Sequence, residues 1–118
     1  MKLIIAGSRT ITDYKILDNF MHALDTLILP SITEIVSGKA RGMDTLGEKW
    51  AKEHNIPIKE FPADWNKYGK SAGYRRNEQM SLYADSAVII MTKGSLGSTH
   101  MKNLMEKVKK PVYLLELS

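Results

Sequence analysis

Short apolar runs alternate along this chain with longer segments whose apolar residues recur at helical spacing, and this alternation limits the folds open to it. The run KLIIA near the N-terminus and the run SAVIIM at residues 86–91 are almost wholly apolar, as is typical of strands buried on both faces. We expect strands at residues 2–6, 32–37, 57–61, 86–91 and 111–117.

The segments between these runs predict helices. Thr12 or Asp13 can cap the first helix, whose apolar stripe continues to Leu27 and Ile28. The later helices are expected from Met43 to about Asn55 with Trp50 in the core, from Tyr74 to Ala84, and around the stripe Met101, Leu104, Met105 and Val108. Residues 62–73 fit neither period, and so long a loop in a small domain favours a functional role.

Strands that alternate with helices of this length predict right-handed crossovers and a parallel sheet covered on both faces. We therefore expect an α/β fold, a Rossmann-like three-layer sandwich of about five parallel strands in the order 3-2-1-4-5, as one domain over residues 1–118. Ligands bind such sheets at the carboxyl ends of the strands, where the strand order reverses. That point lies between the first and fourth strands.

Composition narrows the function classes. With no Cys among 118 residues, disulfide frameworks, zinc ribbons and thiol catalysis are excluded. No stretch has the length of a signal peptide core or of a membrane span, so we expect a cytoplasmic protein without membrane contact. No group of acidic residues or His has metal-site spacing, and we expect neither a metal nor a cofactor. The net charge of +4 mildly favours acidic partners.

The positions of the arginines are more informative than their number. All four, Arg9, Arg41, Arg75 and Arg76, fall in or beside predicted loops between strands and helices. A guanidinium matches two phosphate oxygens at once, whereas a lysine such as Lys39 or Lys93 acts as a point charge. Solvated surface arginines are the alternative interpretation of each one alone. For the set, we expect the guanidinium groups to converge on one anionic ligand.

Three turns rich in Gly and Ser precede predicted helices. They are GSR at residues 7–9, SGKARG at residues 37–42 and TKGSLGST at residues 92–99. Free N–H groups at a helix start favour anions, and glycine lets backbone donors approach a phosphate. Ordinary turn chemistry is the alternative for any single turn. The Walker A loop and the dinucleotide fingerprint are both absent, so the chemistry resembles the named nucleotide motifs without matching them.

Aromatic and acidic residues complete the candidate site. Trp65 could stack on a base and Asp64 could bond a ribose hydroxyl, although Trp65 could instead pin its loop to the body of the protein. For catalysis, the acidic candidates are Asp44, Glu48, Asp64 and Glu78, and we expect Asp44 or Glu48 to act. A carboxylate at the helix start, such as Asp44, is also a normal dipole partner. The full predicted ligand-binding set is Gly7, Ser8, Arg9, Ser37, Gly38, Lys39, Arg41, Gly42, Asp44, Asp64, Trp65, Arg75, Arg76, Asn77, Lys93, Gly94, Gly97, Ser98 and Thr99.

Four stretches together resemble one known superfamily. They are IIAGSRT, VSGKARGMDTLGEKWA, FPADWNKYGKSAGYRRNEQM and GSLGSTHMKNL, which span essentially the whole chain. They look like the SLOG superfamily, in its YspA-related single-domain branch. The resemblance implies a Rossmann-like fold and kinship with the Lonely Guy phosphoribohydrolases, with DNA-processing protein A and with sensor domains for NAD-derived signals.

The resemblance also implies roles for particular residues. The first ligand loop would hold Gly7, Ser8 and Arg9, the second would hold residues 37–44, and residues 75–77 would match the arginine-bearing helix start of the hydrolases. Residues 94–99 fall where the hydrolases have a glycine-rich loop followed by a catalytic Glu. At the acidic positions that follow, this chain has His100 and Met101, which departs from the hydrolase pattern.

These observations support three hypotheses. The first is a protein that binds a nucleotide or nucleotide-derived ligand, such as ADP-ribose, an NAD-derived signal or a nucleoside monophosphate, as a sensor, scavenger or processing protein. The alternatives are a nucleoside monophosphate phosphoribohydrolase and, third, a single-stranded DNA-binding protein. The expected partner is a small nucleotide-derived ligand, with the protein as a homo-oligomer.

Overall fold

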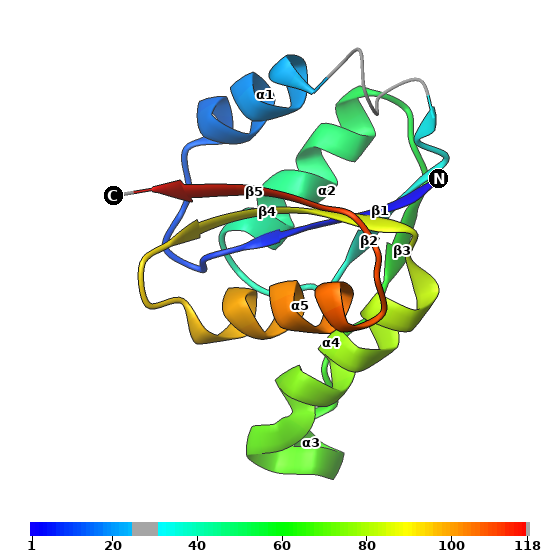
Figure 1. The fold of residues 1–118 in the computed structure, drawn as a ribbon, viewed down its shortest axis with the longest axis vertical. Helices are drawn as coiled ribbons and strands as arrows, with labels where there is room; N and C mark the ends of the chain where they lie inside the picture. Colours follow the sequence, from blue (N-terminus) through cyan, green and yellow to red (C-terminus); the bar gives the residue numbers. More distant parts are fainter. Residues whose placement is uncertain (25–30, 118) are drawn as a thin grey trace.

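The structure, a computed structural model, describes residues 1–24 and 31–117 of the chain. Five parallel strands form one sheet in the order β3-β2-β1-β4-β5, which confirms the predicted order (Figure 1). The strands are β1 (Lys2–Gly7), β2 (Glu34–Ser37), β3 (Ile58–Glu60), β4 (Ser86–Thr92) and β5 (Val112–Leu117). The order reverses between β1 and β4, which pair from Leu3 with Ser86 to Gly7 with Ile90.

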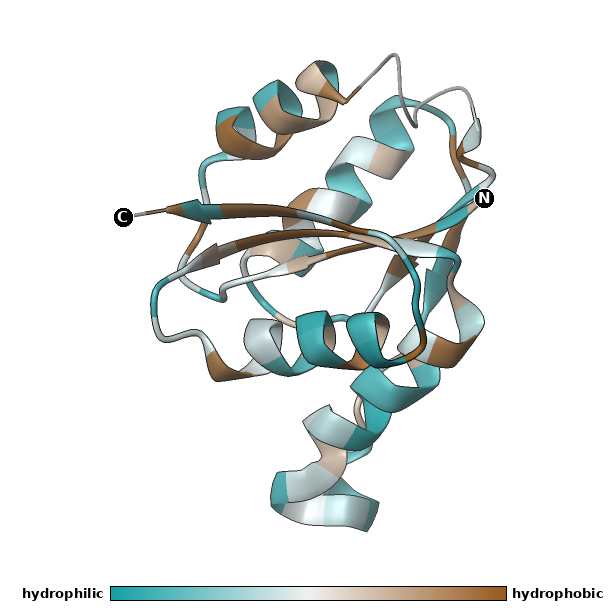
Figure 2. Ribbon diagram, viewed as in Figure 1, coloured by the Kyte–Doolittle hydropathy of each residue, from teal (hydrophilic) through white to brown (hydrophobic). Residues whose placement is uncertain are grey.

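Helices cover both faces of the sheet, as predicted, with α1 and α2 on one side and α4 and α5 on the other (Figure 1). Their bounds are α1 (Tyr14–Ala23), α2 (Met43–Glu53), α4 (Ala72–Tyr83) and α5 (Leu96–Lys107). Figure 2 shows hydrophobic strands between helices that carry hydrophilic stretches. No helix in the described ranges is both long and apolar enough to cross a membrane.

The alternation of side chains along the strands divides the core in two. Leu3 and Ile5 of β1 pack with α1 and α2, where Trp50 is the largest buried side chain. Ile4 and Ala6 of the same strand pack on the opposite face with α4 and α5. Because successive residues of a strand point to opposite faces, a continuous apolar run is needed to feed both cores. Trp50 therefore has the core role predicted for it.

Several boundaries differ from the sequence-based expectations. The segment predicted as an irregular loop, residues 62–73, contains the short helix α3 (Trp65–Tyr68), the 3-10 turn η2 (Gly69–Ser71) and the start of α4. The Asp64 carboxylate begins α3 by accepting the Lys67 N–H at 3.0 Å. A four-residue helix is too short to show helical periodicity, which is why the pattern missed it. Figure 1 shows α3 extending away from the sheet.

The ends of other elements were also shifted. Helix α5 starts at Leu96, inside the predicted turn at residues 92–99, and β2 starts at Glu34 instead of residue 32. Asp13 is confirmed as the cap of α1, because its carboxylate accepts the Lys15 N–H at 3.0 Å. The predicted extension of that helix through Leu27 and Ile28 lies outside the described residues.

Candidate functional site

A cavity of about 410 Å³ opens at the carboxyl ends of β1 and β4, where the strand order reverses. Its walls are the loops that follow these two strands, the starts of α2 and α5, and one face of α4. The lining residues that carry polar groups or charge are Ser8, Arg9, Thr10, Asp44, Arg76, Asn77, Thr92, Lys93, Ser95 and Ser98. The strand topology therefore places a cavity with several polar and charged lining residues at the predicted point.

A second cavity of about 330 Å³ lies beside the first, between the loop after β2 and the segment that leads into α3. It is lined by Arg9, Gly38, Lys39, Ala40, Arg41, Pro62, Ala63, Trp65 and Arg76. Arg9, Ala40 and Arg76 line both cavities. Three of the four arginines thus meet at the cavities, and two of them stand where the cavities adjoin.

Close backbone packing holds the first two loops together. A Cβ added to Gly7 would lie 1.9 Å from the Ile90 carbonyl oxygen, so any side chain there would force β1 and β4 apart. Gly42 has a φ of 72°, and a Cβ there would lie 2.5 Å from the carbonyl oxygens of Ser8 and Arg9. These two glycines are required by close approach of the chain, whatever ligand the loops bind.

Ser8 fastens the end of β1 to the end of β4. Its hydroxyl accepts the Thr92 N–H at 2.8 Å and lies 3.2 Å from the Thr92 hydroxyl, while its own N–H donates to the Ile90 carbonyl at 3.1 Å. Both side chains line the first cavity. The polar atoms of Ser8 are therefore held by the fold, and they fix the shape of the cavity floor.

Arg76 crosses from α4 to the loop after β2. Its Nη1 donates to the Gly38 carbonyl, and its Nε donates to Asn77 Oδ1 at 3.0 Å. Burial lowers the pKa of this guanidinium, with Asp44 acting to raise it and Arg9 to lower it. The opposing effect of Arg9 reflects two like charges at the junction of the cavities. An anion bound there would relieve their repulsion.

Asp44 is a buried carboxylate in this cationic surrounding, with 6% of its surface exposed. Its Oδ2 accepts the Ala40 N–H at 3.1 Å. Burial raises the pKa of Asp44 to about 6, with Glu48 also acting to raise it, while the Ala40 N–H and Arg76 act to lower it. The carboxyl thus titrates in the range of general acids and bases, and it lines the first cavity.

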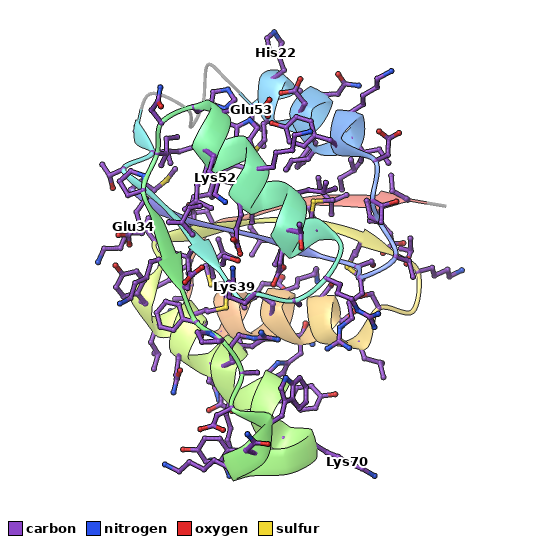
Figure 3. The ribbon with its side chains drawn as sticks, turned by 180° about the vertical axis from the view of Figure 1, so that it is seen from behind. His22, Glu34, Lys39, Lys52, Glu53 and Lys70 are labelled. Carbon is purple, nitrogen blue, oxygen red and sulfur yellow. The ribbon has the colours of Figure 1, made fainter. Side chains whose placement is uncertain are left out.

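Glu48, the other predicted catalytic residue, lies outside both cavities. Its Oε2 accepts the Ser37 hydroxyl at 2.7 Å, and its Oε1 is 3.0 Å from Lys39 Nζ. Lys39 Nζ also lies 2.9 Å from Glu60 Oε2, so its charge is shared between α2 and β3. Figure 3 labels Lys39 near these two elements. Ser37, Lys39 and Glu48 therefore hold the loop after β2 in place, and Lys39 at a φ of 59° has the left-handed conformation.

The start of α5 presents free backbone donors to the first cavity. Ser95 precedes the helix without capping it, since its hydroxyl donates to Ser98 Oγ at 2.9 Å. A Cβ added to Gly94 or Gly97 would meet nothing within 4 Å, so these glycines leave open space. Thr99 lines neither cavity, and its hydroxyl donates to the Ser95 carbonyl at 2.8 Å.

The segment around α3 divides the remaining predicted residues. Trp65 lines the second cavity and is 52% exposed, as a stacking surface must be. Asp64 caps α3 and lines neither cavity. Arg75 is also apart from them, because its guanidinium lies 4.5 Å from the Tyr68 ring centroid and its Nε donates to Ser71 Oγ at 3.1 Å. Successive residues of a helix diverge by about 100°, so only one of the two adjacent arginines reaches the site.

Comparison with known proteins identifies the family of this chain. Residues 1–68 match the YspA, cpYpsA-related SLOG family. The chain is also 32% identical over 84 residues to the Gene 61 protein of Mycobacterium phage D29, and the alignment covers 66% of this chain and 67% of that protein. The chain belongs to the YspA, cpYpsA-related SLOG family. No solved structure matches it.

The family match covers only part of the site of this SLOG protein. Residues 1–68 supply the loops after β1 and β2, with Arg9, Arg41, Asp44 and Trp65. Arg76 and the start of α5 lie beyond the matched range. They join the site through packing of α4 and α5 against the same end of the sheet.

His100 and Met101, the two positions at which this SLOG protein departs from the hydrolase pattern, both pack against other residues near the first cavity. His100 faces the Asn77 amide, 3.2 Å from Nδ2, and packs edge-on against Tyr74, with ring centroids 4.6 Å apart. Burial lowers the pKa of His100, which favours its neutral form. Met101 is buried and lines the first cavity with its thioether side chain. Neither position supplies a carboxylate.

Thr10, Ala40, Pro62 and Ala63 also line the cavities, although their residue types did not predict a role in the site. Ala40 and Ala63 carry no functional side chain, so no side-chain pattern could single them out. Ala40 nevertheless supplies the backbone N–H that orients Asp44. Its place within the SGKARG turn was the one available signal.

Proposed function

We propose that this protein binds a nucleotide or nucleotide-derived ligand, with a phosphate in the first cavity beside Arg9 and Arg76. Membership of the SLOG family supports a nucleotide-related binding or processing role in general. The observation that carries the proposal is that Arg9 and Arg76 line both cavities, so two guanidinium groups are offered to one anion. Guanidinium groups bind phosphate oxygens in pairs, and Arg9 is exposed enough to adjust to the ligand.

The first cavity suits the phosphate end of such a ligand. Lys93, on the loop after β4, and the free N–H groups at the start of α5 supply further positive charge. The hydroxyl pair of Ser95 and Ser98 adds further donors. Backbone and hydroxyl donors recognise charge and shape with little regard for the base, so this end of the site sets affinity more than identity.

The second cavity suits the base. Trp65 offers an exposed indole, and Arg41 on the facing loop offers a flat cation, both of which stack on aromatic rings. At about 330 Å³ the cavity falls in the size range of small-ligand sites. ADP-ribose, NAD-derived compounds and nucleoside monophosphates all combine a phosphate with a base, and the ligand is proposed to belong to this group.

Thermal denaturation with and without nucleotides tests the proposal. AMP, ADP-ribose, NAD and a cyclic nucleotide should each be supplied, followed by calorimetry on any compound that stabilises the protein. A ligand at about 100 times its Kd adds about 2.7 kcal/mol to the free energy of unfolding. If all four leave the melting temperature unchanged, the proposal is wrong. If a DNA single strand binds instead, with an affinity that falls steeply with salt, the nucleic-acid hypothesis replaces it.

Cleavage of the N-glycosidic bond of a nucleoside monophosphate is a second candidate function. The buried carboxyl of Asp44 favours it, because a pKa of about 6 suits proton transfer near neutral pH and the residue lines the cavity. Chromatography of nucleotides incubated with the protein would detect the free base. The candidate fails if no base is released, or if Asp44→Asn releases it at the rate of the natural protein.

A further inference from the structure

We propose that Asp44 is a specificity determinant that accepts a hydrogen bond from a sugar hydroxyl, so that the site selects phosphate esters bearing free hydroxyl groups over inorganic phosphate and hydroxyl-free esters. This inference rests on the proposed function and deepens it. It concerns the class of ligand chemistry, and it assigns Asp44 a contact with the sugar instead of the phosphate.

The geometry around Asp44 leaves one carboxylate oxygen for a ligand. Oδ2 accepts the Ala40 N–H at 3.1 Å and lies closest to Gly38. The Gly38 N–H also acts on this carboxyl and lowers its pKa. No hydrogen bond to Oδ1 occurs among residues 1–24 and 31–117, and every fully buried side-chain oxygen of those residues has a hydrogen-bond partner. Oδ1 is therefore not fully buried, and the first cavity, which Asp44 lines, is the open space beside this residue.

A carboxylate at this place works against a bare anion. Arg9, Arg76 and Lys93 attract a phosphate into the cavity, whereas an ionised Asp44 repels it. A ligand that places a hydroxyl donor at Oδ1 turns this repulsive contact into a charge-assisted hydrogen bond. Specificity arises in this way when a buried polar group is satisfied by one ligand and left unpaired by another.

The ionisation of Asp44 fits an acceptor role. Burial raises its pKa to about 6, so the carboxylate form, which only accepts hydrogen bonds, prevails at neutral pH. Asp64, the residue for which the sequence predicted contact with a ribose hydroxyl, has its carboxylate on the Lys67 N–H outside both cavities. The contact with a sugar hydroxyl that was predicted for Asp64 is therefore available at Asp44.

Calorimetry with AMP and 2′,3′-dideoxy-AMP tests the inference, because the two nucleotides share a base and a phosphate and differ only in the ring hydroxyls. We expect AMP to bind about tenfold more tightly or better, the usual worth of a hydrogen bond to a charged acceptor. In Asp44→Asn, the Ala40 N–H holds the amide oxygen and leaves the NH₂ facing the cavity. The preference for AMP should then fall to about twofold or less, while dideoxy-AMP and inorganic phosphate bind more tightly.

Asp85→Asn is the matched control, because this aspartate accepts the Lys2 N–H at the opposite end of the sheet. It should keep the preference for AMP. Equal binding of AMP and dideoxy-AMP to the natural protein overturns the inference and leaves the proposed function intact, even if Asp44→Asn does not fold. Loss of the preference in Asp64→Asn instead of Asp44→Asn also overturns it. Binding of neither nucleotide overturns the proposed function for nucleoside monophosphates and, with it, this inference.

Discussion

The carboxylate of Asp44 on α2 and the guanidinium of Arg76 on α4 both lie against Gly38. A Cβ placed on Gly38 would lie 2.9 Å from Asp44 Oδ2 and 2.9 Å from Arg76 Nη1, and the Gly38 carbonyl accepts a hydrogen bond from that same Nη1. The absent side chain of Gly38 is thus what lets the carboxylate of α2 and the guanidinium of α4 reach the same turn. A carboxylate and a guanidinium held at the same turn, beside the two cavities, are the central feature of the candidate site.

Gly38→Ala should therefore push the two charged groups apart. Overpacking at a buried position costs about 1–3 kcal/mol of unfolding free energy, and loss of the Arg76 hydrogen bond falls within that cost. Urea denaturation measures the change. The measurement should be repeated with Gly97→Ala, where an added Cβ meets nothing within 4 Å. That change lies in α5 and should raise stability by about 0.4–1 kcal/mol. Equal effects at the two sites would contradict the role given to Gly38.

Arg9→Gln should weaken nucleotide binding with little change in stability. Arg9 is exposed and lines both cavities, so its loss removes a charged phosphate contact worth about 1.5–3 kcal/mol, or about tenfold or more in Kd. Calorimetry measures the affinity. Arg75→Gln is the matched control, because it removes the same charge from a residue that lies on Tyr68 away from both cavities. If both variants lose affinity equally, general charge and not the geometry of the site explains the binding.

Asp44→Asn should stabilise the protein above about pH 7, because ionising the buried carboxyl costs free energy. The folded-state pKa of about 6 lies above the ordinary value of 3.8, so the folded protein holds its proton more tightly. Stability should consequently fall as the pH rises from about 4 to 7, by about 3 kcal/mol at most. Arg76 and Glu48 face Asp44 and are unchanged in the variant.

Urea denaturation of both proteins at several pH values checks this prediction. The gap in unfolding free energy between the variant and the natural protein should widen through that pH window. A gap that stays constant with pH would show that Asp44 ionises in the folded protein at an ordinary pKa.

The two tryptophans should separate stability from binding. Trp65→Ala removes a half-exposed side chain from the wall of the second cavity, so it should leave the unfolding free energy within about 1 kcal/mol and weaken nucleotide binding. Trp50→Ala should cost about 3–5 kcal/mol, since that indole is 1% exposed in the core. Thermal denaturation and fluorescence titration give the two readouts. Unchanged nucleotide affinity in Trp65→Ala would place the base elsewhere.

The pattern of the chain predicted the architecture because the architecture depends on many residues at once. Five apolar runs separated by helical stripes admit few arrangements, and a short local error, such as the start of β2 at Glu34, changes none of them. Helix α3 was missed for the opposite reason. Its four residues depend on one cap at Asp64, and a single side chain leaves no periodic signal.

The same contrast between features set by many residues and features set by one applies to the candidate site. The Gly-rich turns and the positions of Arg9, Arg41, Asp44 and Trp65 could be predicted, because turns after parallel strands must gather at one edge of the sheet. The hydrogen-bonding or packing partner of each side chain could not be predicted. Arg75 and Arg76 are indistinguishable as neighbours in the sequence, yet one lies on Tyr68 and the other reaches the Gly38 carbonyl.

The linear order of residues was thus sufficient for the α/β fold, for the sheet order and for the end of the sheet at which the candidate site lies, since these follow from periodicity and chain connectivity. Tertiary packing alone decided that Glu48 and Lys39 bind each other, that Asp44 is buried with a raised pKa, and that Arg9 and Arg76 join two cavities. Burial and charge pairing depend on residues far apart in the chain, and only the folded arrangement brings them within a few ångströms.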